Sequence, residues 1–177
     1  MKHTLILLFG LFAVRSSQAQ YKATDQGSEI KFTISNFGFD VDGTFKGLQG
    51  NITFDPQNAA AAQFDVTIDA GTVNTDNSLR DSHLRNDSYF DVKNYPRIRL
   101  VSAKIASTGT AGTYQFTGQL TIKNVTKEVS FPFTVSQAGG GLSFSGSFKI
   151  KRKDFGVGGT STISNELTVS LNVLATK

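Results

Sequence analysis

Hydrophobic and polar residues alternate with a period of two along most of the chain. In segment 29–34, for example, Ile30, Phe32 and Ile34 alternate with charged or polar residues. Successive side chains of a strand point to opposite faces of a sheet, so this pattern predicts half-buried antiparallel strands. The pattern returns in five later segments, at residues 63–69, 114–122, 129–135, 142–150 and 167–173. Two less regular segments, 44–55 and 98–105, each slip once in parity and bring the predicted strands to eight.

Turn sequences rich in glycine, asparagine and aspartate separate most of these strands, but residues 71–95 form a longer connection. Its middle, from Ser78 to Asn86, predicts a short helix with Ser78 as the N-cap and Asp81 in the first turn. In the segment 44–55, Gly47 lies at the parity slip and predicts a β-bulge. We predict one all-β domain over residues 20–177, with a short helical insertion.

Eight antiparallel strands with one apolar face can close into a barrel, whose interior is filled by side chains or holds a small ligand. A barrel embedded in lipid would turn its apolar face outward and carry aromatic girdles at both ends. This sequence has no tryptophan and only four tyrosines, and its phenylalanines follow the apolar alternation. We therefore predict an eight-stranded antiparallel barrel whose apolar face points inward.

The interior of this barrel has two interpretations. The many inward phenylalanines can simply form a packed core. Gly118 and Gly146, however, fall on the inward parity of their strands, where a glycine either marks a bulge or leaves space. Apolar walls with spare room would form a pocket for a long apolar ligand.

The first 19 residues are typical of a secretory signal peptide. Lys2 precedes an uncharged apolar run from Leu5 to Val14, and small residues surround a cleavage site after Ala19. The run is shorter than the roughly 20 residues of a membrane-spanning helix. We expect an exported protein, periplasmic or extracellular. Loss of Lys2 and Arg15 with the signal lowers the net charge from +4 to +2, so the composition does not indicate a nucleic-acid partner.

The segment 80–91, RDSHLRNDSYFD, is the most heavily charged part of the chain. After signal removal His83 is the only histidine, so a hydrolase would have to use it. Asp81, Ser82 and His83 are consecutive, and neighbouring side chains point apart, so they cannot form a catalytic relay among themselves. No Gly-x-Ser-x-Gly elbow is present either. We predict no enzyme activity and no cofactor, with a hydrolase as the less favoured alternative.

A metal site is also disfavoured, because with one histidine and no cysteine it would need several carboxylates as further ligands. The alternative is structural: Arg80, Asp81 and His83 hold the long connection over one end of the barrel by pairing with each other or with backbone groups. Buried charges need such partners. On this interpretation Tyr89, Phe90, Tyr95 and Pro96 anchor the far side of the connection in the core.

A short basic run closes one strand, at Lys149, Lys151, Arg152 and Lys153. Most such runs are merely solvated. The alternative is a transient contact with anionic lipid head groups at a membrane surface, which would be weak and sensitive to salt.

Four motifs in order resemble the YceI-like family: FKGLQGNITFD at 45–55, VNTDNSLRDSHLRNDSYFDVKNYPRI at 73–98, GQLTIKNVTKEVSF at 118–131 and KRKDFGVG at 151–158. The resemblance spans essentially the whole mature chain. It implies an eight-stranded, lipocalin-like barrel in exported bacterial proteins. It also implies that the barrel encloses a polyisoprenoid or a similar long amphiphile, such as an isoprenoid quinone.

Two sets of candidate residues follow from the inward alternation and the resemblance together. The ligand-binding set is Phe32, Ile34, Phe64, Val66, Phe116, Gly118, Leu120, Phe131, Phe144, Gly146 and Phe148. The set expected at the head group or in a lid is Arg80, Asp81, His83, Phe90 and Tyr95. The sequence predicts a lipid carrier, a store or a protective binding protein, and a structural or stress-related barrel without lipid remains the alternative. It leaves the oligomeric state open, a dimer included.

Overall fold

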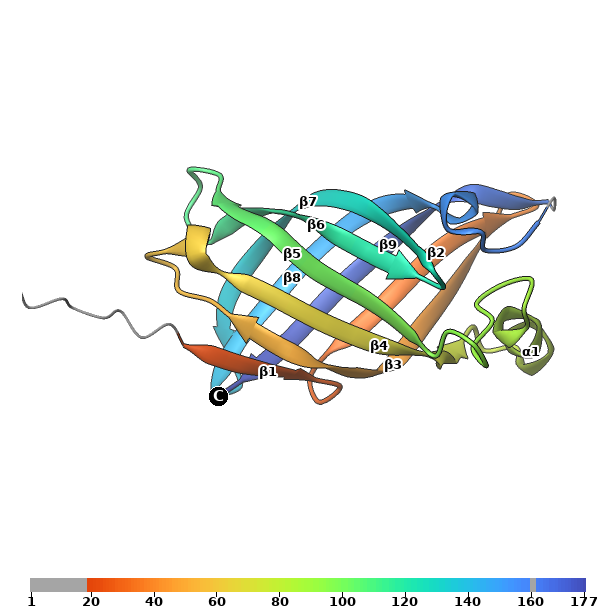
Figure 1. The fold of residues 1–177 in the computed structure, drawn as a ribbon, viewed down its shortest axis with the longest axis horizontal. Helices are drawn as coiled ribbons and strands as arrows, with labels where there is room; N and C mark the ends of the chain where they lie inside the picture. The colour runs from red at the N-terminus through yellow and green to blue at the C-terminus, as the bar shows by residue number, and fades with distance from the viewer. Residues whose placement is uncertain (1–18, 160–161) are drawn as a thin grey trace, which may run out of the picture.

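The computed structural model describes residues 19–159 and 162–177. Apart from Ala19, the predicted signal peptide therefore lies outside the described residues. The rest of the described chain forms one elongated barrel, with a short helix at one end (Figure 1).

Nine antiparallel strands make a single sheet: β1 (Gln20–Thr24), β2 (Glu29–Asn36), β3 (Phe39–Thr53), β4 (Gln63–Asn74), β5 (Arg97–Ser107), β6 (Thr113–Ile122), β7 (Val125–Ala138), β8 (Gly141–Lys151) and β9 (Ile163–Thr176). Their order is β1-β3-β2-β9-β8-β7-β6-β5-β4, and pairing of β3 with β4 closes the sheet. Both β1 and β2 pair with β3 on one side and with β9 on the other. These two strands therefore share one position, and the predicted eight-stranded all-β barrel is confirmed.

The strand missed by the sequence pattern is β1, which has five residues and only one buried side chain, Ala23. It is separated from β2 by a turn that begins at Asp25. The carboxylate of Asp25 accepts hydrogen bonds from the backbone N–H groups of Gly47 and Leu48, both at 2.8 Å. The predicted bulge at Gly47 is confirmed, because the β3–β4 register shifts between Lys46 and Gln49 and Gly47 has a φ of 72°. The Asp25 carboxylate thus holds the β3 bulge in place beside the turn between β1 and β2.

One half of the barrel is filled by aromatic rings. Phe64 lies at its centre, with ring centroids 5.3 Å from Phe144, 5.6 Å from Phe133 and 6.1 Å from Phe116. Most of these pairs meet edge to face, a favoured geometry for aromatic pairs. This half lies toward the short 3-10 helix η1 (Ala59–Ala61), at the end of the barrel opposite the helix α1 (Ser78–Arg85) (Figure 1).

A stack of three rings ends the filled half. The ring of Phe131 lies 4.8 Å from Phe116 and 4.3 Å from Phe148, with interplanar angles of 21° and 12°. Phe148 is the member of this stack that also borders the cavity described below. The stack therefore separates a solid half of the barrel from a hollow one.

Of the two interpretations of the inward glycines, free space is wrong at both Gly118 and Gly146. The bulge is confirmed at Gly118, because the β5–β6 register shifts between its partner Ser102 and Lys104. A Cβ atom on Gly118 would collide with the carbonyl oxygen of Val101 and lie 2.7 Å from the Phe116 ring. A Cβ atom on Gly146 would lie 3.2 Å from the Cβ atom of Phe133. Neighbouring rings already occupy the space that glycine leaves, because both positions lie in the filled half.

Among residues 19–159 and 162–177, three ion pairs lie on the outer surface: Lys31–Asp42, Arg99–Asp65 and Lys149–Glu166. In each pair the hydrogen bond from the cation is the main cause that lowers the pKa of the carboxyl group below its ordinary value. The charge of the cation lowers it further, and at Asp42 a second hydrogen bond, from Thr33, does so too. Any stability these pairs add is present above the ordinary carboxyl pKa of about 4. It is lost as the pH falls through the lower folded values, and exposure keeps it small.

We expect Gly118→Ala to lower the free energy of unfolding by about 1–3 kcal/mol, because the new methyl group has no room against Val101 and Phe116. Gly159→Ala is the matched control, since a Cβ atom there would meet nothing within 4 Å. Urea unfolding of both variants measures the difference. Equal stability of the two would contradict the close packing at Gly118.

Candidate functional site: an apolar cavity under helix α1

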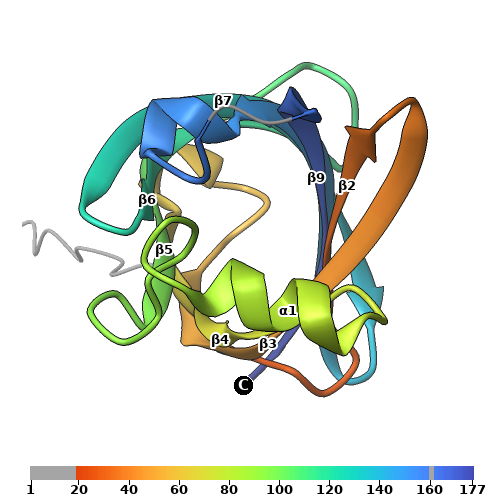
Figure 2. The same cartoon turned by 90° about the vertical axis from the view of Figure 1, so that its right-hand side faces the viewer.

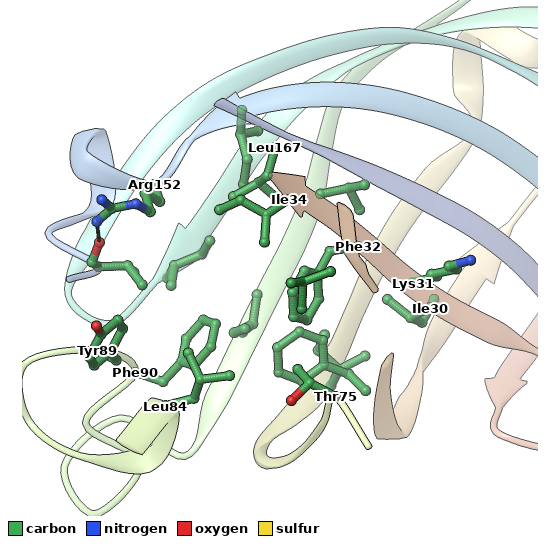
Figure 3. A pocket seen from close by; sticks show the side chains of 18 of the residues that line it. Ile30, Lys31, Phe32, Ile34, Thr75, Leu84, Tyr89, Phe90, Arg152 and Leu167 are labelled. Carbon is green, nitrogen blue, oxygen red and sulfur yellow. Dashed lines mark hydrogen bonds between the residues drawn. The ribbon is translucent and has the colours of Figure 1, made fainter. Parts of the chain in front are cut away.

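The hollow half of the barrel contains a cavity of about 470 Å³. Its wall is almost entirely aliphatic and aromatic, with side chains from β2, β3, β4, β5, β6, β8 and β9. Phe148 lies at its floor, and residues of α1 border its outer end. Figure 3 shows Phe32, Ile34 and Leu167 of the wall with Leu84 and Phe90 across from them. The apolar wall residues are Ile30, Phe32, Ile34, Val41, Phe45, Leu48, Val66, Ile68, Ile98, Leu100, Leu120, Ile122, Phe148, Ile150, Val157, Ile163, Leu167, Val169, Leu171 and Val173.

The cavity exists because residue size changes along the barrel. Inward positions near η1 carry phenylalanine, whereas β9 supplies Leu167, Val169 and Leu171 at the wall of the hollow half. Aliphatic side chains reach less far toward the axis than phenylalanine rings, so the middle stays empty. The volume falls within the range of about 300–1,000 Å³ that is typical of small-molecule pockets.

Helix α1 lies across part of the open end, as Figure 2 shows when viewed along the barrel. The predicted N-cap is wrong by one residue: the cap is Asn77, whose side-chain oxygen accepts a hydrogen bond from the Arg80 N–H at 3.0 Å. The predicted place of Asp81 in the first turn is correct. Asparagine is as good a cap as serine, and the backbone geometry selects which of the two residues serves.

A polar cluster around Thr75 ties α1 to the end of β4. The buried carboxylate of Asp81 accepts hydrogen bonds from the Thr75 N–H at 2.9 Å and from its hydroxyl at 2.5 Å. The guanidinium of Arg80 donates to the Thr75 hydroxyl oxygen and to the Thr75 carbonyl, both at 2.7 Å. Each buried polar group at this junction thereby gains partners, which offsets the cost of removing it from water.

Arg85 makes a second tie at the other end of α1. Its guanidinium donates to the carbonyl oxygens of Gly71 at 2.7 Å and Val73 at 2.9 Å, both in β4. Arg80, Asp81 and Arg85 thus hold the connection over the barrel end, as the structural interpretation expected of the first two. The expected anchoring of Pro96 in the core is wrong, because Pro96 is exposed. Phe90 packs on the barrel wall with its ring edge to face against Phe45, at 5.5 Å.

His83 differs from its charged neighbours because it is exposed and borders the cavity mouth. Among the described residues its imidazole makes no hydrogen bond, so no base–orienter pair of the kind that a hydrolase uses is formed. In the same residues no group of three or more potential ligands is arranged to hold a metal ion. His83 and Arg80 are the polar side chains of α1 that face the opening.

The expected ligand-binding set divides between the two halves of the barrel. Phe32, Ile34, Val66, Leu120 and Phe148 line the cavity. Of the expected head-group or lid residues, Arg80, His83 and Phe90 border it, whereas Asp81 is buried against Thr75 and Tyr95 lies outside the lining. The remaining members are packed in the filled half, away from the cavity: Phe64, Phe116, Gly118, Phe131, Phe144 and Gly146.

Sequence reasoning missed most of the aliphatic wall. The β9 residues Leu167, Val169 and Leu171 showed the same alternation as the phenylalanines, and their smaller size was the available signal. Leu79 and Leu84 of α1 also border the cavity. They could not be assigned from an alternation of period two, because they lie on a helix.

The basic run does not form a continuous charged surface. Lys149 pairs with Glu166 at 2.8 Å. Arg152 is only 4% exposed, and its guanidinium donates to the carbonyl oxygens of Val157 and Ser164 at 2.8 and 3.0 Å. The simple solvated interpretation is thus wrong for Arg152, which holds the 3-10 helix η2 (Arg152–Phe155) and the following loop at the cavity rim (Figure 3).

A scan against protein-family models matches residues 21–175 to the YceI-like domain. The chain belongs to the YceI-like family. It is 36% identical to a UPF0312 protein of Photorhabdus laumondii over 88% of this chain and 86% of the relative. It is also 33% identical to Protein YceI of Salmonella arizonae, over 78% of this chain and 76% of that protein.

Solved structures match the fold. The crystal structure of Burkholderia cenocepacia BcnA has a TM-score of 0.79 at 30% identity, over 84% of this chain and 96% of that one. A polyisoprenoid binding domain from Saccharophagus degradans has a TM-score of 0.69 at 17% identity, over 90% and 99%. At that identity the second match shows the fold alone. In the described residues no helix has the length and hydropathy to cross a membrane.

We expect Asp81→Ala to lower the free energy of unfolding by about 1–3 kcal/mol, because Thr75 then keeps buried donors without an acceptor. Hydrogen exchange of the α1 amides should rise as the helix loosens from β4. Asp87→Ala is the matched control on the same segment, since Asp87 is exposed. The anchoring role of Asp81 is disproved if both variants are equally stable and equally protected.

Proposed function

We propose that this protein is an exported lipid-binding protein that encloses one long isoprenoid-type chain in its barrel. The observation that carries the proposal is the apolar cavity of about 470 Å³, closed below by the phenylalanine stack and bordered above by α1. A solid core would need no such space. Family membership supports the proposal, as does the likeness of the fold to a domain described as polyisoprenoid binding.

The physical basis of binding would be burial of apolar surface. Each Å² of apolar surface removed from water contributes about 25 cal/mol before the entropic cost of association. A flexible prenyl chain presents apolar surface along its whole length, so aliphatic walls suffice without specific polar contacts. Branched aliphatic side chains such as Ile34, Leu167 and Val169 suit a branched hydrocarbon that must fit an irregular space.

The polar end of the lipid would then lie at α1. His83 and Arg80 face the opening, so they are the side chains that a head group would meet first. The guanidinium of Arg80 already donates to Thr75, whereas the His83 imidazole is exposed at the mouth. We infer that His83 is the more available partner for a hydrogen-bonding head group such as a quinone carbonyl, a phenol or a phosphate.

Organic extraction of the purified protein, followed by mass spectrometry, should release about one prenyl lipid or quinone per chain. Val169→Trp should abolish this content, because the larger side chain fills the cavity beside Phe32. Phe133→Leu is the matched control: it lies in the filled half and should lower stability while the lipid is retained. Absence of lipid from the native protein, with no uptake of added isoprenoids, would favour a structural barrel and reject the carrier function.

We further propose that the protein acts outside the cytoplasm. Support comes from the sequence of the first 19 residues, with a basic start and an apolar run of signal-peptide length. The protein recovered from the periplasm or medium of the native host should begin at Gln20, which N-terminal sequencing tests. An uncleaved protein confined to the cytoplasm would reject export.

A further inference from the structure

Three large hydrophobic side chains are exposed in the described part of the chain. They are Phe37, Phe39 and Leu79, with exposed fractions of 72%, 77% and 69%. The two phenylalanines lie at the tip of the β2–β3 hairpin, and Leu79 lies in the first turn of α1. Both elements are at the same end of the barrel (Figure 1), and the end-on view places them on different sides of the opening (Figure 2). The exposed hydrophobic residues thus lie on two sides of the cavity mouth.

The hairpin tip holds a bulky residue in a costly backbone conformation. Asn36 pairs with Phe39, so residues 37 and 38 form a two-residue turn. Both have positive φ, 52° at Phe37 and 83° at Gly38. Glycine adopts this conformation freely, whereas an aromatic residue is disfavoured there. Because the Phe37 side chain is mostly exposed, packing within the chain does not compensate, and strain of this kind often marks a functional position.

Phe39 continues the cavity wall beyond the rim of the barrel. The pairing of β2 with β3 is regular from Ile30–Phe45 to Asn36–Phe39, so Phe39 has the same inward parity as Val41 and Phe45. Those two residues line the cavity, and so does Asn36, the partner of Phe39. Across the opening, Leu79 itself borders the cavity. An apolar surface therefore runs from the cavity to the outermost tips of the molecule.

We propose that this end of the protein docks on a lipid bilayer, with Phe37, Phe39 and Leu79 inserted at the membrane surface and the cavity mouth held against it. Docking would serve the lipid-binding function proposed above, and the proposal rests on that function. A ligand chain could then pass between bilayer and cavity without crossing water. Aromatic and aliphatic side chains that dip into the headgroup region are the usual means of such reversible attachment.

The size of the exposed surface favours a bilayer over a second copy of the chain. At about 150–250 Å² for each phenylalanine, the three side chains together present roughly 400 Å². Each partner in a standard protein–protein interface contributes about 800 Å². The tips also stand on separate elements around an opening, where fluid lipid can fill the space between them.

Charge contributes little to this attachment. On the hairpin the cation of Lys31 is paired with Asp42 at 2.7 Å, and Asp40 lies beside the tip. In the basic run Lys149 is paired and Arg152 is buried. Only Lys151 and Lys153 of that run remain available to anionic lipid. We therefore expect docking to depend on the phenylalanines and to be weakly sensitive to salt.

The test is flotation of the full mature protein with vesicles of phosphatidylcholine and phosphatidylglycerol. Phe37→Ser with Phe39→Ser should weaken vesicle binding by at least about tenfold, because two apolar side chains no longer leave water. Lys151→Ala with Lys153→Ala is the matched control at the same end and should bind as the wild type does. Leu79 is left unchanged because it borders the cavity.

A second measurement separates docking from lipid binding. The double serine variant should bind a prenyl lipid in solution as tightly as the wild type, but deliver it to vesicles at least about tenfold more slowly. Unchanged flotation and delivery by the double serine variant would overturn the docking proposal. Loss of flotation in the lysine variant alone would also overturn it, because attachment would then be electrostatic. A dimer that the serine substitutions convert to a monomer would overturn it in favour of a second copy. Absence of prenyl-lipid binding in solution would reject the proposed function, while flotation still decides docking.

Discussion

The stack of Phe116, Phe131 and Phe148 is the contact on which the organisation of the barrel depends. With ring centroids 4.3 and 4.8 Å apart, it reaches across three neighbouring strands, β6, β7 and β8. On the side toward η1 the remaining rings fill the interior, mostly in edge-to-face contacts. On the side toward α1 the inward residues are mostly aliphatic, and the interior is empty. One end of the barrel therefore supplies stability, and the other end is free to hold a ligand.

The hollow end has a second requirement, because a cavity under a long connection needs that connection to stay in place. The cluster of Thr75, Asp81 and Arg80 meets it by pairing buried polar groups with each other and with the backbone. Arg85 and Arg152 hold two other segments at the same end by donating to backbone carbonyls. Charges that resemble a catalytic set in the sequence thus mainly shape the opening. His83 is left exposed at the mouth, where a head group would meet it.

The proposed ligand route follows from the same arrangement. Strand β3 carries inward residues from the cavity wall to the hairpin tip, where Phe39 leaves the barrel but keeps the parity of Val41 and Phe45. Leu79 continues the apolar surface on α1. The apolar wall and the exposed tips lie at one end of the barrel, with Arg80 and His83 between them at the mouth, and the filled half closes the other end. In the proposed docking, a lipid would therefore enter and leave from one side only, and the protein would have a single orientation on a membrane.

The sequence by itself determined eight of the nine strands and the barrel, because an alternation of period two separates the two faces of a strand; the absence of tryptophan then placed the apolar face inward. It also determined the bulge at Gly47 and the helix near residues 78–86, since these depend on local backbone preferences. Only the tertiary structure decided where the empty space lies. Parity places Phe64 and Val66 on the same face, but whether an inward position borders a cavity depends on the size of side chains from strands far apart in the sequence. For the same reason the sequence could not show whether Gly118 leaves open space, and in the structure the Phe116 ring of its own strand and the Val101 carbonyl of β5 already fill it.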